Sequence, residues 1–344
     1  MCALKGRDRR RIKVKNKAER GMQAETRANR LRIGTRGSPL ALWQAGHVRD
    51  LLVKAHPGIE VEIVPIQTKG DRALDTPLAT VGSKGVFTRE IEQALLSGAV
   101  DLAVHSLKDL PTTLPARLMI GAVCEREDPL DCLVTKGGAR SLVELRAEAV
   151  VATGSPRRKA QLLHLRPDLR IVDLRGNVGT RLRKLDESDW DAIVLAKAGL
   201  VRLGFENRIH CVLSQKEMLP AVCQGALGIE IRQDDSRTAA LVSPLDHAPT
   251  RLATAAERAF LASLGGGCQV PIAALARVGW GTLSLEGLVA SPDGRMYLRR
   301  HMEGPASAAE ALGKALGAEI LEEGGGAILG KVPEKTSDAR KDKR

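Results

Sequence analysis

Two segments of the sequence repeat one local pattern, in which a short apolar run is followed by Ser-Pro and then by an amphipathic stretch. Residues 31–35 precede Ser38-Pro39, and residues 149–153 precede Ser155-Pro156. Serine is a favoured N-cap and proline a favoured first helical residue, so each segment predicts a strand, a turn and a helix. Further strands are expected at 61–66, 100–104, 171–174, 191–196 and 226–231. This alternation predicts two similar α/β units with mostly parallel sheets.

The C-terminal part of the chain has a different pattern. A helix is predicted from Thr250, as its N-cap, to about residue 264, and a glycine-rich loop follows at 265–268. Three strand-like runs and a final helix come next, near 270–277, 282–290, 295–302 and 306–323. Strands that cluster before a helix predict a small α+β domain. The 344 residues are enough for two or three domains, and with only 2 % aromatic residues their cores must be aliphatic.

The net charge of +12 lies almost entirely in the two ends of the chain. Residues 1–30 carry a net charge of +8 and residues 331–344 carry +3, which leaves +1 for the rest. These charged ends predict disordered tails with some affinity for polyanions. The sequence has no nucleic-acid motif, so we expect no specific nucleic-acid partner.

The cysteine and histidine spacings predict neither a disulfide framework nor a metal site. The six cysteines form no CxxC pair, and the seven histidines show no ligand spacing. No apolar run approaches the ~20 residues of a membrane span, and the N-terminus has no apolar signal-peptide core. We therefore expect a reduced, cytoplasmic chain that does not bind membranes, in which Met22 is an alternative start.

Several arginines follow predicted strands, where α/β sheets gather their ligands. They are Arg36, Arg157, Arg158, Arg175 and Arg181, close to predicted helix N-termini at Ser38 and Ser155. Arginine binds carboxylates and phosphates through two parallel hydrogen bonds, and helix N-termini offer free N–H groups to anions. The set predicts a site for a ligand with many acidic groups. The alternative is that each arginine is a solvated surface residue.

Two further residues are candidates for chemistry. Asp109 follows the strand at 100–104 beside Lys108 and could stabilise a cation that forms during a reaction, although a turn residue is the alternative. Cys268 follows three glycines, so its sulfur is expected to be accessible and nucleophilic rather than packed in a core.

Long strings of the sequence resemble the hydroxymethylbilane synthase family, also called porphobilinogen deaminases, from about residue 31 to residue 330. They are RIGTR at 32–36, SPLA at 38–41, KGVF at 84–87, VHSLKDLP at 104–111, CEREDP at 124–129, LRGNVGTRL at 174–182 and GGCQVP at 266–271. The chain departs from the family pattern at Gly154, where serine is common, and at Cys223, where glycine is common.

The resemblance implies two α/β lobes like those of periplasmic binding proteins, with parallel-rich sheets and an active cleft between them, and a small C-terminal α+β domain with the cofactor loop. The implied domain limits are 31–124 with 225–244 for the first lobe, 129–220 for the second and 248–330 for the third domain.

The resemblance also implies the reaction, in which four porphobilinogens are condensed stepwise, with loss of ammonia, on a dipyrromethane attached to Cys268. Hydrolysis then releases linear hydroxymethylbilane for tetrapyrrole biosynthesis, such as that of haem. The implied enzyme is a monomeric, cytoplasmic transferase. The alternatives are a non-catalytic two-lobed polyanion-binding protein, which leaves Asp109 and Cys268 without a task, and a protein that acts through its basic tails.

The implied site residues fall into three groups. Asp109 is the catalytic group, which stabilises the cationic azafulvene-type electrophile formed when porphobilinogen loses ammonia. The cofactor is held by Cys268, Lys108, Asp109, Ser155, Arg157 and Arg158. The substrate is held by Arg36, Ser38, Lys84, Phe87, Arg175, Asn177, Arg181 and Gln224.

Overall fold

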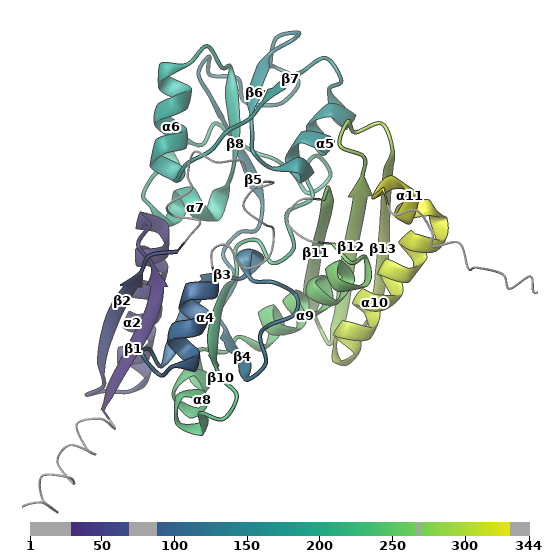
Figure 1. Ribbon diagram of the computed structural model, residues 1–344. Helices are drawn as coiled ribbons and strands as arrows, with labels where there is room; N and C mark the ends of the chain where they lie inside the picture. The colour runs from purple at the N-terminus through teal and green to yellow at the C-terminus, as the bar shows by residue number, and fades with distance from the viewer. Residues whose placement is uncertain (1–28, 69–87, 267–269, 331–344) are drawn as a thin grey trace, which may run out of the picture.

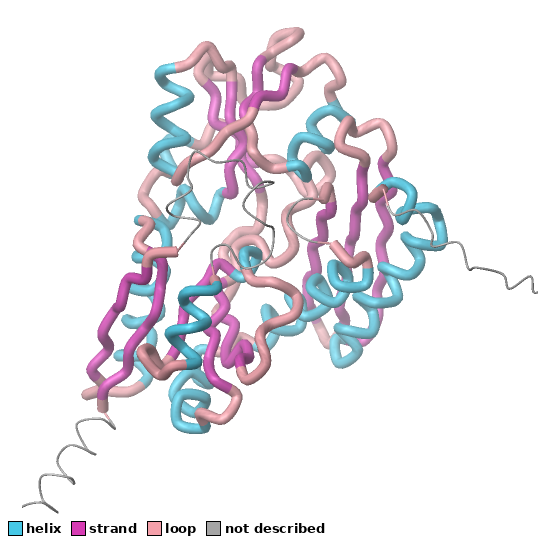
Figure 2. The backbone as a smooth tube through the Cα atoms, viewed as in Figure 1, coloured by secondary structure: helices cyan, strands magenta, loops and turns pink. Residues whose placement is uncertain are grey.

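The computed structural model describes residues 29–68, 88–266 and 270–330 of the chain. Lys84, Phe87, Cys268 and nearly all of the two predicted tails lie outside these ranges. The described chain forms two five-stranded sheets and one three-stranded sheet, which Figures 1 and 2 show as three neighbouring bodies. The two predicted α/β lobes and the C-terminal α+β domain are thereby confirmed.

The first lobe is built on a mixed sheet with the strand order β2-β1-β3-β10-β4. The strands are β1 (Arg30–Arg36), β2 (Glu60–Ile66), β3 (Leu102–Ser106), β4 (Leu118–Val123) and β10 (Leu227–Arg232). β1 runs parallel to β2 and β3, whereas β10 is antiparallel to both β3 and β4. β10, the last strand of this sheet, lies in the sequence after all the strands and helices of the second lobe.

Helices cover both faces of this sheet. They are α2 (Pro39–Ala55), α4 (Arg89–Leu96), the 3-10 turns η1 (Leu107–Asp109) and η3 (Ser243–Leu245), and α8 (Ser236–Val242). Ala45, Val48 and Leu52 of α2 pack on one face together with Val242. Ile91 and Leu95 of α4 pack on the other, against Val100 and Ala103.

The second lobe repeats the same arrangement with the order β7-β6-β8-β5-β9. Its strands are β5 (Asp131–Thr135), β6 (Val150–Ala152), β7 (Arg170–Val172), β8 (Ala192–Ala196) and β9 (Cys211–Val212). β6 is parallel to β7 and β8, and β5 is antiparallel to β8 and β9. The helical segments are α5 (Pro156–Leu165), α6 (Val178–Glu187), α7 (Lys197–Arg202) and η2 (Glu206–Arg208).

The third domain packs its helices on one face of an antiparallel sheet. Its elements are α9 (Ala248–Ser263), β11 (Ile272–Gly279), β12 (Thr282–Ala290), β13 (Tyr297–Pro305), η4 (Ala306–Ala308), α10 (Ala309–Ile320), the π-helical turn η5 (Leu321–Gly325) and α11 (Gly326–Ile328). A Cβ at Gly313 would lie 2.2 Å from the Ala256 carbonyl oxygen, so glycine allows α9 and α10 to approach closely.

The prediction that Thr250 is the N-cap of the first helix of this domain was wrong. α9 begins at Ala248, with His247 as its N-cap and Pro249 in its first turn. Proline favours this early position because its fixed φ suits the first helical turn. The Thr250 hydroxyl instead accepts a hydrogen bond from the Arg126 backbone N–H, at 3.2 Å, and therefore ties α9 to the segment that links the lobes.

Candidate functional site

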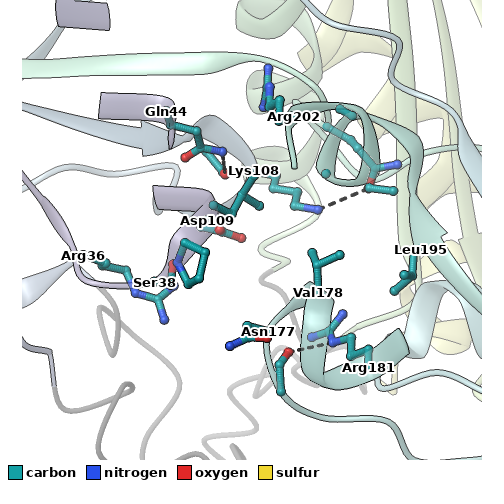
Figure 3. A pocket seen from close by; sticks show the side chains of 18 of the residues that line it. Arg36, Ser38, Gln44, Lys108, Asp109, Asn177, Val178, Arg181, Leu195 and Arg202 are labelled. Atoms are coloured by element: carbon teal, nitrogen blue, oxygen red, sulfur yellow. Dashed lines mark hydrogen bonds between the residues drawn. The ribbon is translucent and has the colours of Figure 1, made fainter. Parts of the chain in front are cut away.

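A cavity of about 730 Å³ lies between the two lobes, lined where strands of both sheets end. Arg36 ends β1 and Ser106 ends β3, while Arg175 follows β7 and Ala196 ends β8. Figure 3 shows Asp109 and Lys108 from the first lobe facing the same space as Asn177 and Arg181 from the second. The volume falls within the range of ~300–1,000 Å³ that is typical of small-molecule sites.

The lining is strongly cationic. Among the described residues it contains six lysine or arginine side chains but only one acidic side chain, that of Asp109. The six are Arg36, Lys108, Arg158, Arg175, Arg181 and Arg202. Such a surface attracts ligands with several carboxylates or phosphates.

Three helices present their capped N-termini near this cavity. The Ser38 hydroxyl accepts from the Ala41 N–H at 3.4 Å, and the Asn177 side chain accepts from the Thr180 N–H at 2.8 Å. Ser155 caps α5 in the same way, at 3.5 Å from the Arg158 N–H. Ser38 and Asn177 line the cavity, whereas Ser155 is not among the lining residues. The predicted Ser-Pro helix starts are confirmed.

Asp109 and Lys108 lie in η1, directly after β3. Asp109 is exposed to the cavity, and Lys108 donates a hydrogen bond from Nζ to Oε1 of Gln224 at 3.4 Å. Burial lowers the pKa of Lys108 to about 8, although the neighbouring Asp109 carboxylate opposes the shift. A partly desolvated ammonium group of this kind gains more from an incoming carboxylate than a solvated one does.

Arg157 and Arg158 share one buried carboxylate. Arg157 NH1 lies 2.8 Å from Oδ2 of Asp131, and Arg158 NH2 lies 2.8 Å from Oδ1. Burial alone would raise the pKa of Asp131, but the two guanidinium groups lower it well below its usual range. Arg158 lines the cavity, whereas Arg157 does not and donates to the Leu219 carbonyl oxygen at 2.6 Å. The cofactor role predicted for both arginines stays a prediction.

Arg175 and Arg181 approach the cavity from the loop before α6 and from its first turn. Arg175 Nε donates to Oδ2 of Asp173 at 2.8 Å, and Arg181 Nε donates to the Gly176 carbonyl oxygen at 2.7 Å. Burial and the nearby Arg158 charge lower the pKa of Arg181 to about 10. Within the part of the chain that the structure describes, no ion pair neutralises Arg181, so its charge is available to a ligand.

Three residues near the site were missed by sequence reasoning. Arg202 of α7 lines the cavity, donates to the Gly225 carbonyl oxygen at 2.6 Å and lies 5.7 Å from the centre of the Trp43 ring. Gln44 lines it as well and donates to the Ser106 hydroxyl at 2.8 Å. Asp131 orients two predicted arginines. Arg202 lies six residues after the strand predicted at 191–196, and Arg181 lies seven residues after the one predicted at 171–174, so this similar spacing could have identified it.

The two departures from the family pattern have local structural consequences. A Cβ at Gly154 would lie 2.6 Å from the Leu174 carbonyl oxygen, so this backbone has no room for a serine there. Cys223 has a φ of 62°, a left-handed conformation that glycine adopts more readily. Both positions line or adjoin the site without removing a predicted contact group.

The described cysteines are poor nucleophiles. Burial raises the pKa of Cys124 to about 11 and that of Cys132 to about 12, and it also raises the pKa of Cys223 and Cys211. Nucleophilic reactivity requires the thiolate, which such shifts disfavour. Among the residues with described positions, no cluster of His, Cys, Asp or Glu could hold a metal ion, and no helix is long and apolar enough to cross a membrane.

Two family models match most of the chain. The model described as "Porphobilinogen deaminase, dipyromethane cofactor binding domain" matches residues 31–240, and "Porphobilinogen deaminase, C-terminal domain" matches residues 251–322.

Solved structures with some likeness to the chain include the methionine binding protein MetQ, which is 16 % identical over 63 % of this chain and 89 % of that chain, with a TM-score of 0.41. The Bordetella pertussis BvgS periplasmic VFT2 domain is 15 % identical over 65 % of this chain and 89 % of that chain, with a TM-score of 0.38.

Proposed function

Since the chain belongs to the porphobilinogen deaminase family, we propose that the cavity between its lobes is where porphobilinogen units are joined. The function is hydroxymethylbilane synthesis within tetrapyrrole biosynthesis, carried out by a transferase with a dipyrromethane cofactor. The observation that carries the site assignment is the six cationic side chains around one carboxylate in this cavity.

The residues of the cavity fit a dipyrromethane. Two pyrrole units carry four carboxylates, and Lys108, Arg158 and Arg181 offer donors from both lobes. Arg181 and Lys108 are partly desolvated, so they gain from carboxylate partners. When bound, the cofactor supplies the pyrrole to which the first substrate unit is joined.

We propose that Cys268 carries the cofactor through a thioether. Cys268 lies outside the described residues, and the support comes from the three glycines that precede it in the sequence and from the chemistry of the other described cysteines. Burial disfavours the thiolate of each described cysteine, so none of them competes well for an electrophilic pyrrole. Ser155 and Arg157 remain proposed cofactor contacts.

Asp109 is the proposed catalytic group. Its carboxylate is the only one that the described residues contribute to the cavity lining, and it faces a surface that would otherwise repel a cation. A fixed negative charge there stabilises the electrophile that forms when the aminomethyl group of porphobilinogen leaves as ammonia. The same carboxylate oxygen can accept the proton that a pyrrole carbon loses after the new bond forms.

The remaining lining residues are proposed to hold and orient the acetate and propionate groups of the substrate. Arg36, Ser38 and Gln224 do so from the side of the first lobe, and Arg175, Asn177 and Arg181 from the second lobe. Lys84 and Phe87 stay predictions. A cytoplasmic location, a monomeric state and supply of haem biosynthesis are further proposals, as are the domain limits given above.

Mass spectrometry tests the cofactor assignment. A tryptic digest of the active protein should carry a pyrrolic adduct on the Cys268 peptide, and Cys268→Ser should fold without adduct or activity. The matched control is Cys211→Ser, a cysteine in β9 on the second lobe that is not among the residues lining the cavity. An unmodified Cys268 peptide in active enzyme would rule the attachment out.

A further inference from the structure

A second, small cavity of about 60 Å³ adjoins the main cavity at Asp109, which lines both. Its lining includes Arg36, Gln44, Thr88, His105 and Asp109, so it joins the proposed catalytic carboxylate to a buried histidine. A cavity needs only ~10–15 Å³ of this kind of volume for one water molecule, provided that polar partners line it. This cavity is therefore large and polar enough to hold water between Asp109 and His105.

His105 belongs to a buried pair. Its Nε2 lies 3.2 Å from Oε2 of Glu230, with the two side chains only 5 % and 0 % exposed. β10 places Glu230 beside Ala103 of β3, two residues from His105 on the same face of the sheet. The other carboxylate oxygen of Glu230, Oε1, has no hydrogen-bond partner in the described chain.

A second buried carboxyl group lies close to this pair. Glu92 of α4 is 8 % exposed, and its Oε1 also lacks a hydrogen-bond partner among the described residues. Burial raises the pKa of Glu92, and the Glu230 carboxylate adds to this rise, while the Thr88 hydroxyl and His105 oppose it. The three groups therefore form one electrostatically coupled set.

A structural role alone explains this set poorly. The same face of the sheet is otherwise packed with Ile91, Leu95, Val100 and Ala103. Buried ionisable groups with unsatisfied oxygens destabilise a fold, and apolar residues of similar volume are commonly at least as stable. Because His105 lines the same small cavity as Asp109, these buried groups are placed to exchange protons with the Asp109 carboxylate.

The condensation itself produces a proton that must leave. The C–N bond of the aminomethyl group breaks, and its electron pair departs with nitrogen as ammonia. A pyrrole carbon forms the new C–C bond and then releases its hydrogen as a proton, which restores the aromatic ring. Because the aminomethyl group enters as ammonium, each added unit yields one ammonia and one proton.

We propose that His105, backed by Glu230 and Glu92, is a proton-holding site for this reaction that shares the small cavity with Asp109. The Asp109 carboxylate accepts the proton and passes it through water in the small cavity to the His105 ring nitrogen. The imidazole later returns it along the same path to ammonia, which leaves as ammonium. Asp109 is thereby ionised again before the next unit arrives. This inference rests on the role proposed for Asp109.

Other charged groups face this set and contribute to its protonation. Arg36 and Asp109 lie in the small cavity, Glu90 precedes Glu92 on α4, and Arg258 of α9 interacts electrostatically with Glu230. Arg36, Glu90 and Arg258 are the same in every variant that tests the proposal.

A nuclear magnetic resonance titration of histidine side chains tests the proposal without measuring turnover. His105→Gln assigns the His105 signals in protein with ¹⁵N-labelled imidazoles. If the proposal holds, the ring signals respond to pH in the range where the enzyme turns over, and this response differs in Asp109→Asn. A ring whose signals do not respond to pH there overturns the proposal.

Rapid-quench kinetics supplies the second measurement. His105→Gln should slow each elongation step by about 10²-fold with little change in KM, because proton transfer and not binding is impaired. The matched control is His56→Gln, at the far end of α2, where Nε2 contacts the Leu241 carbonyl oxygen. Equal elongation rates in the two variants would contradict the proposal.

Glu92→Gln keeps the test decisive if His105→Gln does not fold. The amide resembles the neutral form that burial favours at this position, so folding should be retained. It removes a carboxyl group that could exchange a proton with His105, so each elongation step should slow, as in His105→Gln. An elongation rate equal to that of the wild type contradicts the proposal. Loss of hydroxymethylbilane formation by the wild type, in contrast, would refute the proposed function itself.

Discussion

Replacing Asp131 by asparagine should destabilise the protein far more than the loss of a surface ion pair does. Asp131 is fully buried and lies 2.8 Å from NH1 of Arg157, NH2 of Arg158 and Nε2 of Gln224. The amide keeps a hydrogen-bond acceptor but leaves two buried guanidinium groups without their counter-charge. Removing one partner of a buried ion pair typically costs about 3–5 kcal/mol.

We expect Asp131→Asn to lower the free energy of unfolding by about 3 kcal/mol, the lower end of that range, because the acceptor remains. Urea denaturation at neutral pH, followed by circular dichroism, measures this difference. The matched control is Asp186→Asn, whose carboxylate lies 2.7 Å from Arg208 but is 53 % exposed. That change should cost less than about 1 kcal/mol. Equal unfolding midpoints for the two variants would refute the reasoning.

The same variant has a predictable pH dependence. The pKa of Asp131 is lowered in the folded state, so its stabilising contribution is present above the unfolded pKa of about 3.9 and is lost as the pH falls further. The stability gap between wild type and Asp131→Asn should therefore shrink below about pH 4. Because Arg158 and Gln224 line the cavity, the variant should also carry less cofactor by intact-mass measurement.

Three other changes test single side chains of the cavity. Asp109→Asn should fold normally but reduce turnover by about 10²–10³-fold in a stopped assay, because the amide cannot offset a developing positive charge; near-normal turnover would contradict this role. Native mass spectra of Arg175→Lys should show accumulated enzyme forms with fewer added pyrroles, because lysine cannot bind a carboxylate through two parallel hydrogen bonds. If the variant completes the tetrapyrrole at the normal rate, Arg175 does not hold the substrate. Lys108 should lose its charge as the pH rises through about 8, so loading of the cofactor onto apoprotein should slow above that pH, and Lys108→Gln should remove this dependence.

Local signals in the sequence were sufficient for most helices and strands. The strands expected at 31–35 and 61–66 correspond to β1 and β2, and the Ser-Pro helix starts correspond to α2 and α5. Caps and apolar periodicity act over a few residues, so they can be recognised without knowing the fold. The long family strings added what periodicity could not, namely the reaction and the cofactor.

Strand order could not be obtained in this way. Residues 226–231 were recognised as a strand, but its place between β3 and β4 depends on partners more than 100 residues earlier in the chain. β4, β5 and β9 were not predicted, and β9 has only two residues. Pairing across such distances follows from packing of the whole lobe and not from local preference.

The sequence by itself determined the α/β alternation, the helix caps and the list of arginines, because these depend on neighbouring residues and on recognisable strings. Only the tertiary structure decided which charges remain available. Arg157 and Arg158 are adjacent in sequence, yet Asp131 binds both, and only Arg158 lines the cavity. His105 and Glu230 meet because two distant strands pair. The charge and the pKa of a group depend on what surrounds it in space, and those neighbours are brought together only by folding.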